Sequence, residues 1–384
     1  MTRLAQQPWL TSTASRSLLA ALAGAGATPR FVGGCVRDGL LGRASKDLDI
    51  AIDQAPEDSM RLLETAGIKV IPTGLKHGTI TALAEGQHFE ITTLRVDVET
   101  FGRHAKVAFT DDWQEDAARR DFTINAIYAD RDGQIYDPVG GQADLAAGRV
   151  CFVGDAAQRI EEDKLRILRF FRFFALFGRG EPDRGALAAC TAAAPGIAGL
   201  SGERVRDETF KLLAAADPLP SLQLMAEAHV LQQILPDGFD LERLARTDGD
   251  PLRRLSAIAT TGAAAIAERL RLSNKQTSRL GFLMAPPANL SADITRPALR
   301  QLLYDHGAEG IGDLALQQGL PELLPRIDEA TPPPFPLKGS DALALGMRPG
   351  PNVGQKLRAL EEAWRADDFV ASRDQLLAEL ARRK

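Results

Sequence analysis

The chain of 384 residues has little of what several common classes of protein are built from. Its three cysteines, Cys35, Cys151 and Cys190, are far apart and form no CxxC pair. This excludes a disulfide framework or a cysteine zinc site and is typical of a reducing compartment, so we expect a cytoplasmic protein. The five histidines are scattered without an adjacent His–Asp pair, which gives no sign of a hydrolase metal centre.

Long apolar runs and an excess of positive charge are missing as well. No run approaches the ~20 apolar residues of a membrane-spanning helix, so we expect no membrane partner. The net charge of −5 does not indicate a nucleic-acid-binding protein, although such binding depends on local basic patches. Nothing indicates an obligatory protein partner. Arginines do cluster locally, at residues 119–120, 166–172, 204–206, 253–254 and 269–279.

The chain does contain a glycine turn followed by two aspartates. The turn is GGCVRD at residues 33–38, and Asp47 and Asp49 follow within KDLDI at residues 46–50. Apolar residues at 48, 50 and 52 alternate with positions 47, 49 and 51, which predicts a strand carrying both carboxylates on one face. Two such carboxylates repel each other unless a cation lies between them, and Mg²⁺ is the usual cation beside a substrate phosphate. This favours metal-assisted phosphoryl or nucleotidyl transfer; the alternative is a solvated pair on an edge strand.

Two further features gain their meaning from that aspartate pair. Gly33 and Gly34 form either an ordinary tight turn or a cradle that offers N–H groups, together with Arg37, to a triphosphate. Glu90 lies within the expected strand FEIT at residues 89–92. It is either a third catalytic carboxylate of the same cleft or a solvated residue of the outer face. The role of the loop residue His77 is left open.

A second block, RRDFTINA, covers residues 119–126. Arg120 and its neighbour Arg119 could grip a triphosphate, and Asp121 or Asn125 could hold a ribose hydroxyl. The alternative is a helix end that carries a solvated salt bridge.

A third block, EDKLRILRFFRF, covers residues 162–173. At ~100° per residue, Asp163, Arg166 and Arg169 span about 120° of one helix face, and Arg172 lies further round. Apolar residues surround them, so we expect a buried helix whose arginines are paired or bind a polar ligand. The alternative is a structural ion pair between Asp163 and Arg166.

An aspartate beside an arginine matches the Watson–Crick edge of two bases. Cytosine presents an amino donor beside the acceptor N3, and adenine presents an amino donor beside N1; a carboxylate accepts and a guanidinium donates. Uracil and guanine invert this pattern and leave both protein groups mismatched, which is costly. Asp163 and Arg166 could therefore select C and A over U and G without a nucleic-acid template.

The pattern of the chain changes near residue 150. Before it, expected strands at 31–32, 79–83, 88–94, 124–128 and 134–136 mix with helices. After it, helical spacing dominates, and the proline-rich segment 331–336 is typical of a stiff linker before a tail with an amphipathic helix at about 353–364. We expect an α+β fold with domains at residues 1–150, 151–216, 217–330 and 331–384.

These blocks, in this order, resemble the class II tRNA nucleotidyltransferases, the CCA-adding enzymes, which share their head domain with bacterial poly(A) polymerases. The resemblance implies that Asp47 and Asp49 bind Mg²⁺ and that residues 119–126 contact the triphosphate and ribose. It implies that Asp163 and Arg166, in an EDxxR motif, act as an amino-acid template for the base, and that Arg169 and Arg172 also contact the nucleotide. GERVR at residues 202–206 resembles the helical motif that supports the template helix.

The resemblance also implies an architecture and a reaction. The head has a small mixed sheet of the polymerase-β type, followed by an all-helical neck, body and tail. The substrates are CTP, ATP and a tRNA lacking its CCA end, and the tRNA 3′-hydroxyl attacks the α-phosphate with release of pyrophosphate. Segment 95–116 is a flexible loop in the family, and its Arg103, His104 and Lys106 depart from the pattern of Gram-positive members. A poly(A) polymerase, a CC-only enzyme and a silent RNA-binding protein remain alternatives.

Overall fold

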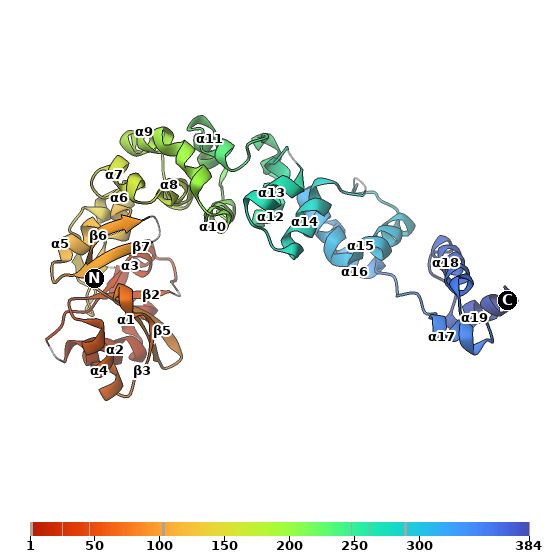
Figure 1. Cartoon of the computed structure of the whole chain (residues 1–384), viewed down its shortest axis with the longest axis horizontal. Helices are drawn as coiled ribbons and strands as arrows, with labels where there is room; N and C mark the ends of the chain where they lie inside the picture. Colours follow the sequence, from red (N-terminus) through yellow and green to blue (C-terminus); the bar gives the residue numbers. More distant parts are fainter. Residues whose placement is uncertain are drawn as a thin grey trace. The chain divides into compact units, whose positions relative to one another are not determined.

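The structure, a computed structural model, describes residues 3–383 except 25, 46, 102–103, 247, 261 and 288–289. Its contacts divide the chain into two compact units, which we describe separately (Figure 1). The first unit is Met1–Gly238 with Arg269–Arg271, and the second is Phe239–Glu268 with Leu272–Lys384. The domain borders at residues 150, 216 and 330 stay predictions.

A mixed seven-stranded sheet forms the N-terminal part of the first unit, with the strand order β3-β4-β5-β2-β1-β8-β9. β2 and β5 run parallel, and the other neighbours are antiparallel. The α+β class is therefore confirmed. The strands are β1 (Arg30–Val32), β2 (Leu48–Ile52), β3 (Lys69–Gly74), β4 (Thr79–Ala84), β5 (Gln87–Thr93), β8 (Tyr128–Ala129) and β9 (Ile135–Tyr136).

Two predicted connections differ from the structure. The loop expected at residues 95–116 is largely a second, two-stranded sheet of β6 (Arg95–Phe101) and β7 (His104–Phe109), followed by helix α5 (Trp113–Ala118). Its β-branched residues alternate with polar ones, which favours a hairpin. The expectation for Arg103, His104 and Lys106 falls outside the described residues and side chains.

The strand predicted at residues 124–128 is also too long. Thr123–Asn125 form a 3₁₀ turn, and the strand β8 begins only at Tyr128. The Asp121 carboxylate accepts hydrogen bonds from the backbone N–H of Phe122 and the side chain of Asn125, at 2.9 and 3.0 Å. Such local side-chain bonds compete with strand pairing and favour a turn.

Helices complete the first unit and form all of its regular structure after residue 150 (Figure 1). The central one, α8, is rich in phenylalanine, and Phe170 and Phe171 are fully buried. Phe122 of the N-terminal part packs against Phe173 of α8, with ring centroids 5.1 Å apart. The helices are α1 (Pro8–Thr11), α2 (Thr13–Ala23), α3 (Gly34–Leu40), α4 (Pro56–Thr65), α5, α6 (Gly141–Ala147), α7 (Ala156–Glu162), α8 (Leu165–Phe177), α9 (Arg184–Ala193), α10 (Gly202–Leu213) and α11 (Leu219–Glu227).

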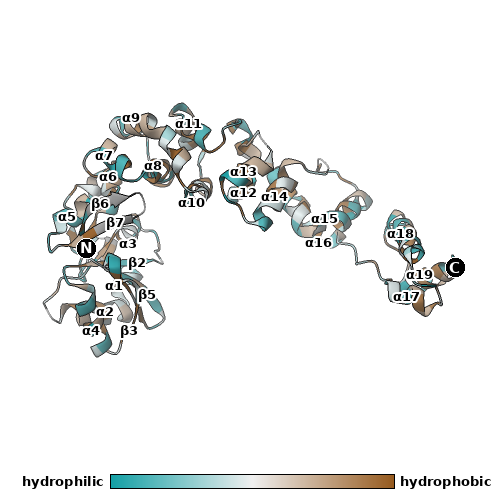
Figure 2. Cartoon of the chain, viewed as in Figure 1, coloured by the Kyte–Doolittle hydropathy of each residue, from teal (hydrophilic) through white to brown (hydrophobic). Residues whose placement is uncertain are grey.

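The second unit is helical, and hydrophilic and hydrophobic residues alternate along its helices (Figure 2). Leu314 and Leu323 are buried in one core, and Leu360 and Trp364 in another. The predicted linker at 331–336 has neither helix nor strand, and the predicted amphipathic helix is α18. Among the described residues, no helix could cross a membrane. The helices are α12 (Pro251–Ile258), α13 (Ala263–Arg269), α14 (Asn274–Met284), α15 (Arg296–Gln317), α16 (Leu323–Ala330), α17 (Gly339–Ala344), α18 (Pro351–Ala366) and α19 (Arg373–Arg382).

Candidate active site

Three carboxylates gather on the neighbouring parallel strands β2 and β5. Asp49 and Glu90 face each other in the strand register, and Asp47 immediately precedes β2. Leu48 and Ile50 are buried while Asp47 is exposed and Asp49 half-buried, which matches the predicted alternation. Burial, together with the nearby charges of Glu90 and Asp47, raises the pKa of Asp49 to about 6, against an opposing effect of Arg120.

The glycine turn lies beside the second predicted block. Gly33 has a φ of 71°, a left-handed conformation that favours glycine, and α3 begins at the next residue. A Cβ added to Gly33 would lie 3.7 Å from the backbone oxygen of Asn125 and 3.8 Å from Nη1 of Arg120. The Nη1 of Arg37, on the first turns of α3, donates to Oδ1 of Asn125 at 2.5 Å. The structure thus brings the predicted residues of these two blocks together.

Arg120 is held by a residue that sequence reasoning missed. Asp116 is 1% exposed and accepts from Arg119, Arg120 and the Tyr128 hydroxyl at 2.8, 3.0 and 2.7 Å. Burial alone would raise the pKa of Asp116, but the charges of Arg120 and Arg119 lower it to about 2. The predicted alternative of a solvated salt bridge does not hold, because this pairing is buried. The signal was the spacing of three and four residues from Asp116 to the two arginines.

Asp121 joins the N-terminal part to α8. Its Oδ2 accepts from Nε of Arg169 at 2.7 Å, while its Oδ1 accepts from Phe122 and Asn125. Burial would raise the pKa of Asp121, but the Arg169 guanidinium holds it below its usual value. The carboxylate predicted to hold a ribose hydroxyl thus has protein partners on both oxygens.

Asp163 and Arg166 do not share a helix face, so that part of the prediction is wrong. Asp163 has extended backbone angles (φ −154°, ψ 108°) in the break between α7 and α8, because its Oδ1 accepts from the backbone N–H of Leu165 at 3.0 Å. The expected alternative, an ion pair between the two, is not formed either. Asp163 pairs with Arg204 at 2.6 Å, and Arg166 pairs with Glu162.

Arg169 and Arg172, both on α8, share one buried counter-charge. Glu208 on α10 is 5% exposed and lies 2.6 Å from Nε of Arg172 and 3.7 Å from Nη1 of Arg169. Sequence reasoning missed Glu208, although it lies four residues after Arg204 and therefore on the same side of α10.

The three carboxylates suit a divalent cation whose remaining ligands are other oxygen atoms. Among the described residues, no three His, Cys, Asp or Glu side chains could hold a metal by themselves. Asp47 and Asp49 would supply two carboxylates, and octahedral Mg²⁺ usually takes its other ligands from water and substrate phosphates. Burial is the main cause of the raised pKa of Asp49, and repulsion by Glu90 and Asp47 adds to it; a bound cation would relieve that repulsion. His77 is exposed, and its backbone oxygen accepts from Arg95.

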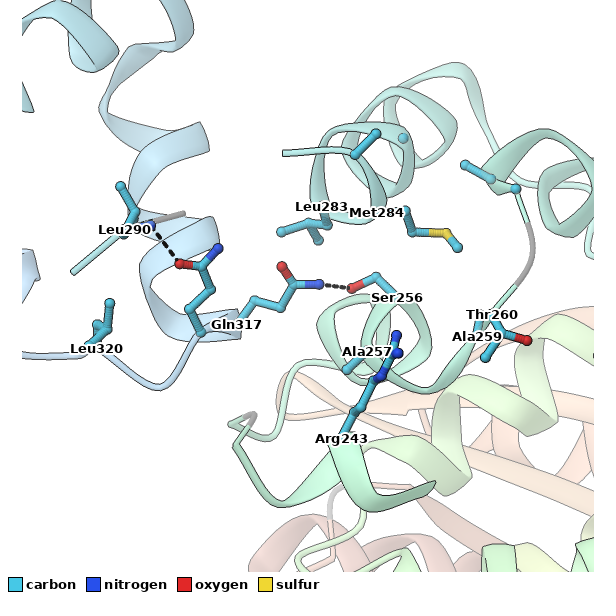
Figure 3. A pocket seen from close by; sticks show the side chains of 15 residues that line it. Arg243, Ser256, Ala257, Ala259, Thr260, Leu283, Met284, Leu290, Gln317 and Leu320 are labelled. Atoms are coloured by element: carbon cyan, nitrogen blue, oxygen red, sulfur yellow. Dashed lines mark hydrogen bonds between the residues drawn. The ribbon is translucent and has the colours of Figure 1, made fainter. Parts of the chain in front are cut away.

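A cavity of about 1040 Å³ belongs to the second unit and not to this site. Gln317 of α15 donates to Oγ of Ser256 at 2.7 Å on its wall, as Figure 3 shows. The described residues of its lining include no carboxylate and one arginine, Arg243, which pairs with Asp240. This composition does not suit metal-assisted chemistry.

Two family models match the chain. The model described as the poly A polymerase head domain matches residues 29–151, and the one described as a probable RNA and SrmB-binding site of polymerase A matches residues 181–241. The carboxylates, the glycine turn and Arg120 all lie within the first match.

The names of the following similar proteins all state the same activity. The "CCA tRNA nucleotidyltransferase 1, mitochondrial" of Danio rerio is 36% identical, covering 92% of this chain and 86% of that protein. The CCA-adding enzyme of Leuconostoc mesenteroides is 30% identical, covering 94% of each. The crystal structure of the Bacillus stearothermophilus CCA-adding enzyme in complex with CTP is 28% identical, with a TM-score of 0.80 over 98% of this chain and 97% of that one. The chain is therefore an enzyme of the CCA tRNA nucleotidyltransferase family.

Proposed function

We propose that the enzyme adds C, C and A to the 3′ end of a tRNA that lacks them, from CTP and ATP and without a nucleic-acid template. The observation that carries the proposal is the placement of Asp49 beside Glu90, next to the Gly33 turn and Arg120. This combines carboxylates for a metal with a turn and a guanidinium for a triphosphate. The names of the relatives support the substrates.

Asp47 and Asp49 would hold two Mg²⁺ ions, as in a two-metal nucleotidyl transfer. When bound, the metal lowers the pKa of the attacking 3′-hydroxyl and neutralises charge on the leaving pyrophosphate. Glu90 adds negative charge beside Asp49 and strengthens the attraction for the cation. Arg120, held in place by Asp116, has its guanidinium near Gly33 of the glycine turn, where the triphosphate would lie, and the guanidinium of Arg37 lies near Gly34.

Asp163 and Arg166 select the base in this proposal. The Asp163 carboxylate accepts from the amino group of C or A, and the Arg166 guanidinium donates to N3 or N1. Arg166 uses Nη1 for its contacts with Glu162 and the backbone oxygen of Arg159. In the described part of the chain its Nε and Nη2 have no such partner, so they can face the base.

The remaining parts of the proposal concern the tRNA and the compartment. The helical second unit holds the tRNA by shape and by phosphate contacts, as is usual for structured RNA. We also propose a cytoplasmic location, which the three free cysteines support.

Incorporation of each of the four nucleotides into a tRNA transcript that ends before its CCA sequence tests the function. We expect CTP to be added twice, ATP to be added after the second C, and UTP and GTP to be rejected. A protein that adds none of the four would contradict the proposal.

Replacing Asp163 by alanine tests the base-selecting assignment. The preference of the variant for CTP over UTP should fall about a hundredfold. In the wild type, uracil leaves the Asp163 carboxylate without a hydrogen-bond donor, and alanine removes this penalty. Triphosphate binding in the presence of magnesium should stay unchanged, since Asp163 is not among the carboxylates of β2 and β5. A variant that kept the wild-type preference would contradict the assignment.

A further inference from the structure

We propose that the sheet face beside Asp49 and Glu90 holds the 3′-terminal nucleotides of the tRNA, an inference that rests on the proposed function and gives one substrate its place. The strand register aligns Asp49 of β2, Glu90 of β5, Thr81 of β4 and Ile71 of β3 in one row. Neighbouring strands lie ~4.8 Å apart, so the row extends about 10 Å beyond Glu90. We call this surface the open face; its other residues are Lys69 and Thr73 of β3, Thr79 and Leu83 of β4, and His88 and Thr92 of β5.

The two faces of this part of the sheet differ in what covers them. Ile80 and Ala82 of β4 point away from the open face and are fully buried, and the helices α2 and α4 pack against that strand. On the open face, Ile71 is 40% exposed, and His88 and Glu90 are exposed as well. The open face is therefore accessible to a substrate.

The direction of the reaction places the tRNA end on this side of β2. In the proposed function the triphosphate lies at the Gly33 turn, and that turn follows β1, which is the other neighbour of β2. The attacking and leaving oxygens lie roughly in line through the reacting phosphorus. With pyrophosphate leaving toward Gly33, the 3′-hydroxyl approaches Asp49 from the side of Glu90. The nucleotides that precede this hydroxyl then lie over β5, β4 and β3.

The open face offers hydroxyl groups in pairs. The hydroxyls of Thr73 and Thr81 are 2.9 Å apart, and those of Thr79 and Thr92 are 3.1 Å apart. One hydroxyl of each pair donates to its partner, so the other keeps its proton for an outside acceptor. The phosphate and ribose oxygens of RNA are such acceptors. Hydroxyls that already hold each other lose less freedom on binding than isolated ones.

The charges around the open face suit a phosphate backbone. Lys69 and His88 lie at one end of it, and Lys76 lies in the turn between β3 and β4; all three are exposed. Glu90, the single carboxylate among the residues of the open face, lies at the edge next to Asp49, where a metal ion would meet its charge. Ile71 supplies an apolar contact for a base. This combination fits single-stranded RNA, which proteins bind through backbone charge and through contacts with unstacked bases.

Two substitutions test the phosphate contact. Lys69→Gln removes a charge from the open face, and Arg61→Gln removes one from α4, where the side chain is 75% exposed. Affinity for a tRNA transcript lacking CCA is measured by filter binding at several salt concentrations. Lys69→Gln should weaken binding about fivefold and reduce the slope of log affinity against log salt by about 0.7, the value for one phosphate of a single strand. Arg61→Gln should change neither quantity.

A second pair of variants tests the hydroxyls. Thr81→Val keeps the shape and the strand preference of the side chain but removes its hydroxyl. It should lower kcat/KM for the tRNA about tenfold, the usual effect of losing one hydrogen bond to a charged group, while KM for CTP stays unchanged. Thr65→Val, at an exposed position on α4, should keep the wild-type values of both.

A crosslink locates the RNA on the wild-type enzyme without any variant. A tRNA transcript whose last nucleotide is 4-thiouridine is irradiated in the complex, and the crosslinked peptide is identified by mass spectrometry. We expect attachment within residues 69–92. Attachment confined to other segments, or wild-type tRNA binding and kcat/KM in both Lys69→Gln and Thr81→Val, would overturn the inference. A wild-type protein that crosslinks within residues 69–92 but adds neither CTP nor ATP would instead contradict the proposed function.

Discussion

Replacing Asp49 by asparagine is expected to lower the rate of nucleotide addition by about a thousandfold or more. A metal at the reacting phosphate contributes several kcal/mol to transition-state stabilisation, and each ~1.4 kcal/mol is a factor of ten in rate. Asparagine has nearly the same shape but carries no charge, so the cation would lose a negatively charged ligand without a change in packing. The measurement is single-turnover addition of one C to a tRNA transcript at saturating CTP.

The same variant should fold at least as stably as the wild type in the absence of metal. Burial and the charges of Glu90 and Asp47 raise the pKa of Asp49, which means that its ionised form is disfavoured in the folded state. Asp53 offers a matched control near the end of β2, where its carboxylate accepts from the N–H of Thr28 at 2.6 Å. Asp53→Asn should keep near wild-type activity. An Asp49→Asn enzyme with more than about a tenth of wild-type activity would show that this carboxylate is not needed for metal chemistry.

The second large effect is expected at Asp116, and it concerns stability. Asp116→Asn should lower the free energy of unfolding by about 3–5 kcal/mol, because Arg119 and Arg120 would lose a buried counter-charge. Nucleotide addition should fall as well, since Arg120 would no longer be held near the glycine turn. Urea unfolding at pH 7, followed by circular dichroism, measures the first effect.

The pH dependence of unfolding gives an independent measure of the same group. The pKa of Asp116 is about 2 in the folded protein and ordinarily 3.8, so the depressed value contributes about 2 kcal/mol of stability above pH 4–5. That contribution should be lost as pH falls toward 2, and the difference between wild type and Asp116→Asn should shrink over this range. Glu115→Gln, one residue away and exposed, is the control, with an expected change below about 1 kcal/mol. Equal stability of the two variants would contradict the assignment.

The features that could be predicted from the sequence are those set by neighbouring residues. The alternation around Asp47 and Asp49 predicts β2 because a strand has a period of two, and the apolar surroundings of Arg169 predict the buried helix α8. The sequence leaves two alternatives for Glu90, a third carboxylate of the same cleft or a solvated residue, and does not predict its register with Asp49, because strand order depends on contacts between distant segments.

The features that were missed depend on long-range partners or on competition between local bonds. Helical spacing placed Asp163 on the face of Arg166, but its side chain caps the N–H of Leu165 and breaks the helix there. The pairings of Asp163 with Arg204 and of Arg172 with Glu208 join residues about 40 apart, and no periodicity in the sequence reports them. The hairpin β6–β7 differs from the loop that the family resemblance predicts for this segment, although its residues alternate as in strands.

The sequence of the reaction product tests the central claim most directly. The purified protein is incubated with magnesium and a tRNA transcript that ends at its discriminator base, with CTP and ATP together and with each alone, and the 3′ ends are sequenced. We predict that the product ends in C-C-A with both nucleotides and in C-C with CTP alone. A long run of A, or a stop at C-C when both nucleotides are present, would contradict the proposed function and indicate a poly(A) polymerase or a CC-adding enzyme.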